Sequence, residues 1–317
     1  MGMHFPALIG SFRVLSRALL AAGAVLAPSA PALADWRTDL GTFRIGMTSS
    51  DASGLSPAEI SELQTAYAKA LGMPVEITAF RDYPSLIDAQ ASSRIEYAIY
   101  SATAYGTAWI ACECVEPLVA PVQTNGAIGL RSVLVLNAGA AFTRLDLNGI
   151  RIGVPGKDSV TGLAIPLVEY TIGSRVLSPD ERFFSVFPDA AANTAAFVSG
   201  KIDGFFGWAA SDANGAVAQS GLMNSGTSIS FTDGRKSVDI KTPWTSNLLR
   251  YGPHAVRRNL PPEIKQVLRN FLTSLDPDGV DLFSLMPPHD LAKFSEVRQA
   301  DYNLAIAVAK AAVTASK

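Results

Sequence analysis

The sequence predicts an α/β fold built as two lobes. Strand-like and helix-like segments alternate along the chain, and such alternation is typical of parallel sheets covered by helices on both faces. The chain has 317 residues, which is enough for two lobes of ordinary domain size after an N-terminal segment is set aside. A hydrophobic fraction of 48% and a charged fraction of 17% are typical of a compact globule and not of a disordered chain.

Helices and strands follow one another along the first half. A capping box with proline at the first helical position, Ser56-Pro57-Ala58-Glu59, opens a predicted helix over residues 56–71, and Gly72 is suited to end it. Shorter helices are expected over residues 86–91 and 104–111. Strands are expected over residues 43–47, 75–80 and 97–100.

The second half continues the alternation up to about Gly234. Strands are expected over residues 132–136, 150–154 and 204–208, and helices over residues 163–177 and 189–199. Beyond that point, Leu260-Pro261-Pro262-Glu263 opens a strong helix whose apolar residues recur at helical spacing up to Leu275. A final helix is expected over residues 294–312.

The N-terminus has the three parts of an export signal in the right order. Arg13 and Arg17 form a positive region, residues 18–27 form a short apolar core, and Ala32-Leu33-Ala34 supplies the small residues of a cleavage site. The apolar run is too short to span a bilayer, which needs about 18 residues. We therefore expect residues 1–34 to be a signal peptide and the mature chain to be a soluble protein outside the cytoplasm.

Charge and cysteine content narrow the function classes. Removing residues 1–34 removes two arginines and no acid, so the formal net charge goes from −2 to −4. That balance argues against nucleic acid as a partner but leaves an anionic ligand open, because the field at a site can oppose the net charge. Cys112 and Cys114 form a Cys-x-Cys pair, for which buried thiols or a local disulfide are favoured over a metal site.

The loop between the strand at 150–154 and the following helix is the best candidate for a binding site. Its sequence, Pro155-Gly156-Lys157-Asp158-Ser159-Val160-Thr161-Gly162, is rich in hydroxyls and small residues. The first N–H groups of a helix have no partner within it and lie at the positive end of its dipole, which suits an anion. The same residue types also serve as ordinary helix caps, so the loop alone leaves both interpretations open.

Further segments of the chain are typical of the same kind of protein as this loop. Their order along the chain is more specific for that kind of protein than any single segment. In chain order they are Phe43-Arg44-Ile45-Gly46-Met47, Ala70-Leu71-Gly72-Met73-Pro74-Val75, Tyr83-Pro84-Ser85-Leu86, Ile95-Glu96-Tyr97-Ala98, residues 101–105, Leu130-Arg131-Ser132-Val133-Leu134, Asp146-Leu147-Asn148-Gly149, Asp158-Ser159-Val160-Thr161-Gly162 with Pro166, and Gly200-Lys201-Ile202-Asp203-Gly204. In this order the chain resembles the phosphonate/phosphite/phosphate-type periplasmic substrate-binding proteins of bacterial ABC importers.

The resemblance implies a two-lobed periplasmic binding protein-like fold, with a mixed sheet flanked by helices in each lobe and a ligand cleft at the hinge. Lobe 1 would take residues 35–127 plus 235–317, and lobe 2 residues 128–234. Such proteins close around their ligand, and the closed form is what the permease recognises. The implied partners are a small oxyanion ligand and an ABC permease in the inner membrane, with no nucleic acid and no cofactor, and the protein is expected to be a monomer.

The resemblance implies ligand-binding roles for individual residues of this chain, each at a position that matches the family's pattern. Ser159, Val160, Thr161 and Gly162 would hold the oxyanion, Ser132 would add a hydroxyl, Tyr83 and Ser101 would close over it from lobe 1, and Asp203 would lie near the ligand's substituent. Three of them also have a structural interpretation: Tyr83 as a turn aromatic, Asp203 as a helix end, and Ser132 as a solvated strand residue.

The chain departs from the family where the family commonly carries a histidine followed by an acid. Those positions are Ala190 and Ala191 here, and Leu130 replaces an aromatic residue in the strand that contains Ser132. Asp189 replaces the missing acid only if it reaches the cleft. An aminoalkylphosphonate is therefore disfavoured, which leaves a simpler phosphorus oxyanion or another small acid as the expected ligand.

Other function classes remain to be compared with this one. An enzyme is disfavoured because no nucleophile elbow, zinc motif or Walker loop is present, and His254 and His289 have no neighbouring catalytic pattern. No catalytic or metal-binding residues are assigned. A binder of a sulfonate, thiamine precursor or carboxylate shares the architecture, and so does a solute sensor for a membrane receptor.

Overall fold

The computed structural model describes residues 36–139, 147, 149–212, 217–219, 228–230, 237–275, 285 and 291–315. The chain from Trp36 onward forms one compact unit. The predicted signal peptide and His289 lie outside the described residues. Within the described part, no helix is both long enough and apolar enough to cross a membrane.

The first sheet has six strands in the order β16-β4-β15-β3-β1-β2. Strands β1, β2 and β3 are parallel, while β15 and β16 run antiparallel to their neighbours. The strands are β1 (Phe43–Thr48), β2 (Val75–Phe80), β3 (Tyr97–Ile99), β4 (Val115–Gln123), β15 (His254–Arg257) and β16 (Leu291–Glu296).

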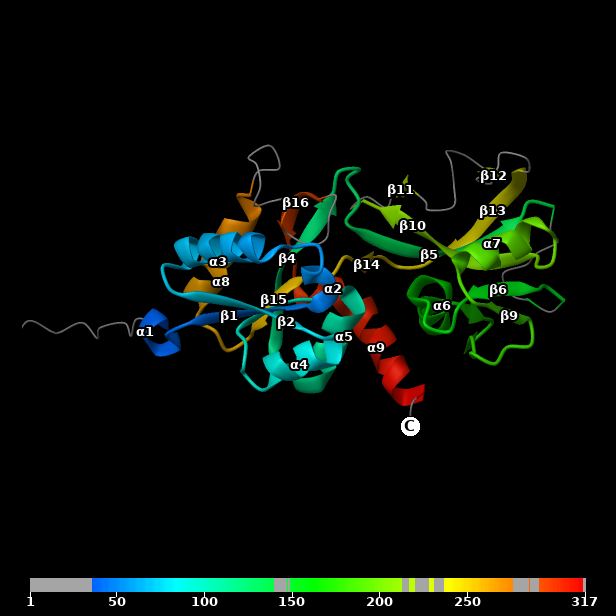
Figure 1. Ribbon diagram of the computed structural model, residues 1–317. Coiled ribbons are helices and arrows are strands. Elements are labelled where there is room, and N and C mark those ends of the chain that lie inside the picture. Colours follow the sequence, from blue (N-terminus) through cyan, green and yellow to red (C-terminus); the bar gives the residue numbers. More distant parts are fainter. Residues whose placement is uncertain are drawn as a thin grey trace, which may run out of the picture. The chain divides into compact units, whose positions relative to one another are not determined.

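Helices cover both faces of this sheet (Figure 1). On one face, α3 (Pro57–Leu71) and α8 (Pro262–Thr273) bury their apolar sides against β1 and β3. On the other face lie α4 (Tyr83–Ala91) and α5 (Ala102–Cys112). The capping box predicted for α3 is present, with Ser56 as the N-cap and Gly72 in the left-handed conformation at the C-terminal end. Two short helices, α1 (Trp36–Leu40) and α2 (Ser49–Ala52), flank β1.

The second sheet follows the order β12-β13-β5-β10-β6-β9, with β11 and β14 paired at its margins. In it, β6 is parallel to both β9 and β10, whereas β5 is antiparallel to β10 and β13. The strands are β5 (Gly129–Asn137), β6 (Ile152–Pro155), β9 (Phe184–Phe187), β10 (Gly204–Ser211), β11 (Val217–Gln219), β12 (Ser228–Ser230), β13 (Ser237–Thr245) and β14 (Leu249–Arg250).

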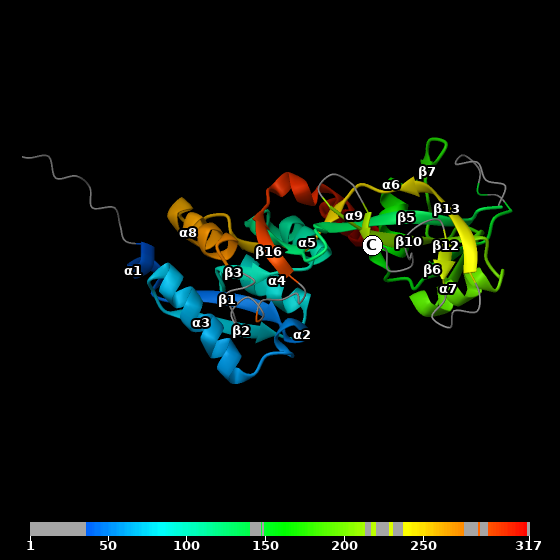
Figure 2. The same ribbon diagram turned by 90° about the horizontal axis from the view of Figure 1, so that it is seen from above.

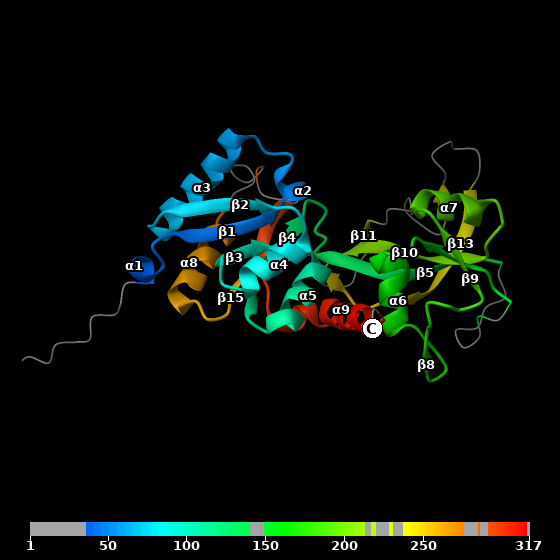
Figure 3. The same cartoon turned by 60° about the horizontal axis from the view of Figure 1, so that its bottom comes forward.

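Helices lie on both faces of the second sheet (Figure 3). Helix α7 (Ala190–Val198) packs Ala196 and Phe197 against one face. The opposite face is covered by a single π-helical turn, η1 (Val160–Ala164), and by α6 (Ile165–Glu169), which continues from it. After α6 the chain makes a small hairpin of β7 (Thr171–Ile172) and β8 (Arg175–Val176).

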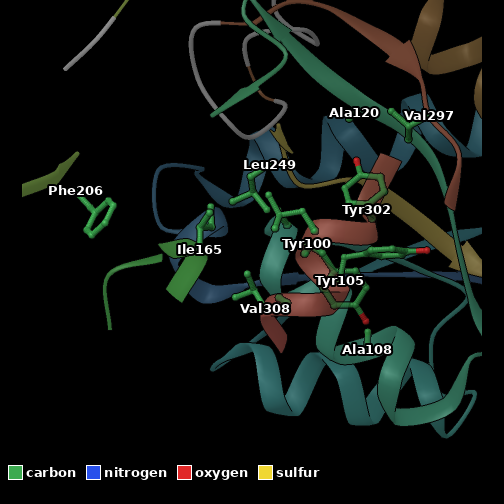
Figure 4. Close-up of a cluster of buried hydrophobic side chains, with 14 of the residues drawn as sticks. Tyr100, Tyr105, Ala108, Ala120, Ile165, Phe206, Leu249, Val297, Tyr302 and Val308 are labelled. Carbon is green, nitrogen blue, oxygen red and sulfur yellow. The ribbon is translucent and has the colours of Figure 1, made fainter. Parts of the chain in front are cut away.

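The C-terminal helix α9 (Asn303–Ala315) lies against α5 (Figure 2). The approach is close at Gly106, where a Cβ would lie 2.5 Å from the carbonyl oxygen of Ala305. Just before α9, the short 3-10 helix η2 (Gln299–Tyr302) places the Tyr302 ring 4.8 Å from the ring of Tyr105 (Figure 4). These rings belong to a buried apolar cluster that anchors the C-terminal segment.

The structure confirms the predicted α/β class with mixed sheets flanked by helices, but it corrects three details. The helix expected over 163–177 ends at Glu169, because Gly173 adopts a left-handed turn that reverses the chain into a hairpin. The helix expected over 294–312 begins only at Asn303. Residues 291–296 instead form β16, whose hydrogen-bonding partner is β4.

The third correction concerns where the chain leaves the second sheet. The sequence predicts this crossing near residues 234–235, but β13 and β14 keep the chain in the second sheet up to Arg250. Pairing of β13 with β5 buries Trp244, whose ring centroid lies 5.7 Å from that of Phe206. The return to the first sheet therefore falls between β14 and β15.

Candidate functional site

The loop after β6 folds as the sequence suggests, into a capped helix start. The Ser159 hydroxyl accepts a hydrogen bond from the Gly162 N–H at 3.0 Å, so Ser159 is the N-cap. Its carbonyl oxygen accepts from the N–H groups of both Leu163 and Ala164, each at 3.0 Å. The bond from Ala164, and that from the Ile165 N–H to the Val160 carbonyl, span five residues and make the turn π-helical. Single π-turns of this kind are frequent at functional sites.

Four donors on this turn have no partner within the described part of the chain. They are the backbone N–H groups of Val160 and Thr161, the Ser159 hydroxyl proton and the Thr161 hydroxyl. The two N–H groups belong to the first helical turn, where no intrahelical acceptor exists, and they carry the positive end of the dipole. The turn therefore offers a cluster of neutral donors to one small anion.

Gly162 lets this turn pack closely onto the strand before it. A Cβ at Gly162 would lie 2.4 Å from Cγ of Pro155 and 2.7 Å from the Ser159 hydroxyl oxygen. Both distances are shorter than real Cβ contacts. Glycine here is thus required by the close approach, which brings the Ser159 cap over the end of β6.

Ser132, on strand β5, holds the loop in position through a hydrogen bond. Its side chain is fully buried, and its hydroxyl donates to the Thr161 carbonyl oxygen at 2.6 Å. A serine hydroxyl has one proton, so this proton is not available to a ligand. The structure thus gives Ser132 the geometry of a positioning residue rather than that of a donor to the anion.

A cavity of about 310 Å³ opens beside the donor cluster. Its volume is at the lower end of the range for small-molecule sites. No residue that lines it carries a formal charge. The lining residues are Pro155, Ser159, Thr161, Ala190, Asn193, Thr194, Phe205, Phe206, Gly207 and Trp208.

Tyr83 and Ser101, the two candidates from the first sheet, lie together. Ser101 is the N-cap of α5 and Tyr83 begins α4, so both follow the carboxyl ends of parallel strands, where α/β proteins bind ligands. Burial raises the pKa of the Tyr83 hydroxyl, Asp51 adds to the rise, and its hydrogen bonding with Ser101 acts the other way. Tyr83 is therefore protonated at neutral pH and can donate.

The neighbouring Asp82 has a different role. It caps α4, accepting from the Ser85 N–H at 2.9 Å and from the Ser85 hydroxyl. The Ser85 hydroxyl and N–H, with help from Arg81, hold the pKa of the Asp82 carboxyl at about 2. This carboxylate is thus ionised and already satisfied by its own helix.

The structure does not bring Asp203 to the donor cluster. Asp203 forms a bidentate ion pair with Arg151, at 2.8 and 3.0 Å, and also accepts from the Arg151 backbone N–H at 2.8 Å. Gly204 pairs in parallel with Ile152, so Asp203 lies at the amino end of β6, whereas the loop follows its carboxyl end. Three strand residues, about 10 Å, separate the two ends.

Asp189 likewise serves a helix. Its carboxylate accepts from the Ala192 N–H at 2.7 Å and caps α7. The structure therefore shows a local capping role for Asp189, and the carboxylate does not line the cavity.

Two cavity residues, Asn193 and Trp208, are absent from the predicted site. Asn193 occupies the same helical face as Ala196 and Phe197, which are buried against the sheet. A polar residue on the buried face of an apolar helix is the sequence signal that could have found it. Trp208 lies in a run of aromatic residues that, from the sequence, could line a cleft for an organic ligand but that more often belong to a core.

The cysteines and the buried histidine have structural positions. Cys112 and Cys114 form a disulfide at the end of α5. Among the described residues, no cluster of three or more His, Cys, Asp or Glu side chains could hold a metal ion. His254 is buried, with its ring next to the hydroxyl of Tyr97.

Comparison with known proteins identifies the family. Residues 45–302 match the family of ABC transporter, phosphonate, periplasmic substrate-binding proteins. The chain belongs to this family. The match covers both sheets, including the donor cluster after β6. This family consists of solute-binding proteins and not of enzymes, so the chain has a small-molecule ligand and an inner-membrane permease as its partners.

Solved structures share the fold at low sequence identity. A Xanthomonas citri protein bound to chloride ion is 16% identical, with a TM-score of 0.55, over 86% of this chain and 99% of that one. A Mycoplasma hyorhinis protein described as a putative thiamine pyrophosphate transporter is 8% identical, with a TM-score of 0.54, over 84% and 98%. These two descriptions name different molecules, and a shared fold does not by itself select a ligand.

A binding protein component of an ABC phosphonate transporter from Pseudomonas aeruginosa is also similar. It is 17% identical over 82% of this chain and 83% of that one, with a TM-score of 0.44. No sequence among curated proteins matches the chain.

Proposed function

We propose that the protein captures a small phosphorus oxyanion, such as a phosphonate, phosphite or phosphate, on the donor cluster after β6. The observation that carries the proposal is the convergence of four unpartnered donors on Ser159, Val160 and Thr161 beside a cavity with no charged lining. Membership of a phosphonate-binding family supports the same ligand class.

Neutral donors suit a carrier. Hydrogen bonds to an anion are stronger than neutral ones, and the helix end adds a favourable dipole. The cavity lining includes no lysine or arginine side chain to hold the anion by a full countercharge. Binding of this kind is selective, because the donors fit a compact oxyanion, and it allows release to a permease.

Tyr83 and Ser101 are proposed to close over the ligand. They form a second pair of hydroxyls at the carboxyl edge of the first sheet, and Tyr83 is uncharged at neutral pH. Closure of one lobe onto the other would add these donors to those of Ser159 and Thr161. We place lobe 2 at the second sheet and lobe 1 at the first. Asp203 and Ser132 are left out of direct ligand contact.

The cellular setting is part of the same proposal. Residues 1–34 would direct export, and the mature chain would work in the periplasm as a soluble monomer that delivers its ligand to the permease. Light scattering of the mature chain tests the monomer, and N-terminal sequencing of protein recovered from the periplasm tests cleavage before Asp35.

A thermal-shift panel tests the ligand class. The panel contains phosphate, phosphite, methylphosphonate, larger phosphonates, sulfonates and carboxylates. A ligand that binds only the native state stabilises it by RT ln(1 + [L]/Kd), about 2.7 kcal/mol at a hundredfold excess over Kd. We expect a rise in Tm with at least one phosphorus oxyanion.

The matched variants are Thr161→Val, which removes one free hydroxyl, and the double replacement of Ser159 and Thr161 by alanine. The double variant should lose the ligand-induced shift. A shift with sulfonates or carboxylates alone would contradict the proposal, as would a full phosphonate response in the double variant.

A further inference from the structure

The wall of the cavity opposite the donor cluster holds a buried amide without a hydrogen bond. Asn193 is 1% exposed, and its Oδ1 atom has no hydrogen-bond partner within the described residues. Neither end of this amide makes a hydrogen bond there. Oδ1 is inaccessible to solvent and packs against Gly153, so Nδ2 is the end of the amide that a ligand in the cavity can reach. Buried polar groups are nearly always satisfied, so an unpaired amide beside a cavity indicates a group that a ligand completes.

The local packing is arranged around this amide. Oδ1 of Asn193 lies where a Cβ of Gly153 would be, at 2.0 Å from the ideal position. Any side chain on that strand residue would displace the amide. The absence of a side chain at Gly153 therefore lets α7 approach β6 closely enough for Asn193 to reach the cavity.

Trp208 supplies an apolar surface on the same cavity. It is 36% exposed, although the two residues on either side of it along β10, Gly207 and Ala209, are buried. Trp208 pairs directly with Ser132 across the β5–β10 ladder, so the two side chains lie on the same face of the sheet. Because Ser132 donates to the Thr161 carbonyl, Trp208 lies next to the donor cluster.

The cavity has more room than an inorganic oxyanion needs. Its volume of about 310 Å³ lies within the range of about 300–1,000 Å³ for sites that hold small organic molecules. A phosphate ion has five non-hydrogen atoms. The lining includes the Asn193 amide and the Trp208 indole, and no carboxylate lines the cavity.

We infer that Asn193 and Trp208 form the substituent end of the site, and that the ligand is a phosphonate or phosphate monoester with an uncharged, hydrogen-bonding substituent. This inference rests on the proposed function, because it assumes that the donor cluster holds the phosphorus oxyanion. The Nδ2 group donates, which matches a hydroxyl or carbonyl oxygen on the substituent. The indole face covers the carbon skeleton of the substituent.

The same geometry disfavours an aminoalkyl substituent. An ammonium group is strongly hydrated and has three donors, so burying it without a countercharge is costly. The reachable end of the Asn193 amide is a donor and offers an ammonium group no acceptor, and the nearest acid in the sequence, Asp189, caps its own helix. Discrimination should therefore depend on the charge of the substituent and much less on its size.

Two ligands of equal length test the inference on the unmodified protein. Isothermal titration calorimetry compares 2-hydroxyethylphosphonate with 2-aminoethylphosphonate, and methylphosphonate reports on the donor cluster alone. We expect the hydroxy compound to bind at least tenfold more tightly than the amino compound. If the amino compound binds equally well or better while methylphosphonate binds, the inference is overturned and the proposed function stands. If none of the three binds, the inference is overturned, and the proposed function is overturned as well only when phosphate and phosphite also fail to bind.

Variants of Asn193 provide the second arm. Asn193→Ala should weaken the hydroxy compound about tenfold and change methylphosphonate less than threefold. Asn193→Asp, which has nearly the same shape, should shift the ratio of amino to hydroxy affinity at least tenfold toward the amino compound. Equal losses for all three ligands in Asn193→Ala would mean a purely structural role and would overturn the inference.

Trp208 is tested with phenylphosphonate. Trp208→Ala should weaken this ligand about tenfold, and Trp208→Phe should restore most of the affinity. Methylphosphonate should respond to neither change. Circular dichroism melting of each variant checks that the fold is kept. If phenylphosphonate binds Trp208→Ala as tightly as the unmodified protein, the role given to Trp208 is refuted.

Discussion

The substitution Gly162→Ala gives opposite expectations from the sequence and from the structure. Gly162 lies inside a helical turn without a positive φ, so helix propensity alone predicts that alanine stabilises the protein by about 0.5–1 kcal/mol. The structure predicts the reverse, because the new Cβ would lie 2.4 Å from the Pro155 ring and 2.7 Å from the Ser159 hydroxyl oxygen.

The magnitude follows from which of these atoms can move. The proline ring belongs to β6 and cannot rotate away, so relief requires a backbone shift, and overpacking of this kind costs about 1–3 kcal/mol. The Ser159 hydroxyl can rotate, but it then gives up its cap, at about 1 kcal/mol. After the propensity gain is subtracted, the net loss is about 1–3 kcal/mol. At about 2–4 °C per kcal/mol this lowers Tm by roughly 2–12 °C.

Differential scanning calorimetry measures this change, and titration of the best phosphorus oxyanion measures the accompanying loss of affinity, expected to be tenfold or more. Gly139→Ala is the matched control, because the nearest heavy atom to its Cβ would be at 3.5 Å, an ordinary contact. A Gly162→Ala protein that melts at or above the unmodified Tm and binds ligand normally would refute the close approach and the role given to the Ser159 cap.

Three further predictions concern single side chains. Ser132→Ala should lower Tm by a few degrees and weaken ligand binding indirectly, because the Thr161 carbonyl loses its buried donor; an unchanged affinity would show that this brace is dispensable. Asp203→Asn should lower the stability of the protein at pH 7 without changing Kd. The ion pair with Arg151 lowers the pKa of the Asp203 carboxyl, so its stabilising contribution is present above the ordinary pKa and is lost as pH falls through the lowered value. Melting curves of the variant and the unmodified protein should therefore converge in acid. Tyr83→Phe should weaken ligand binding with little change in Tm. The contribution of Tyr83 to ligand affinity should be constant from pH 6 to 8, because the pKa of its hydroxyl is raised. A change in Kd with a midpoint near neutral pH that disappears in Tyr83→Phe would count against this.

Local signals in the sequence account for much of the fold. The capping box at Ser56 and the left-handed Gly72 define α3, and residues 75–80 form β2 as expected. These features depend on interactions between residues close in sequence. The helix expected over 294–312 fails at its start because β16 is stabilised by pairing with β4, more than 160 residues earlier in the chain. Local patterns carry no information on such a partner.

Some parts of the candidate site likewise follow from local sequence, and others depend on pairing between distant strands. The Ser159 cap and the free donors of Val160 and Thr161 follow from a short motif, so the sequence could find them. The position of Asp203 depends on the parallel register of β6 and β10, which sets it at the far end from the loop and opposite Arg151. Trp208 could not be separated from core aromatics without the ladder that pairs it with Ser132.

The hydroxyl of Thr161 tests the strength of the donor cluster separately from folding. It makes no hydrogen bond within the described protein, so Thr161→Val should leave Tm unchanged. Loss of a hydrogen bond to a charged group costs about 1.5–3 kcal/mol, which corresponds to a roughly 10- to 150-fold weaker Kd. Thr161→Ser should retain most of the affinity.

A crystal structure of the protein with the tightest phosphorus oxyanion from the ligand panel tests the central claim most directly. The account predicts phosphoryl oxygens within about 2.7–3.1 Å of the Val160 and Thr161 backbone nitrogens and of the Ser159 and Thr161 hydroxyls. An anion held elsewhere, for example by arginine side chains away from the turn after β6, would contradict it.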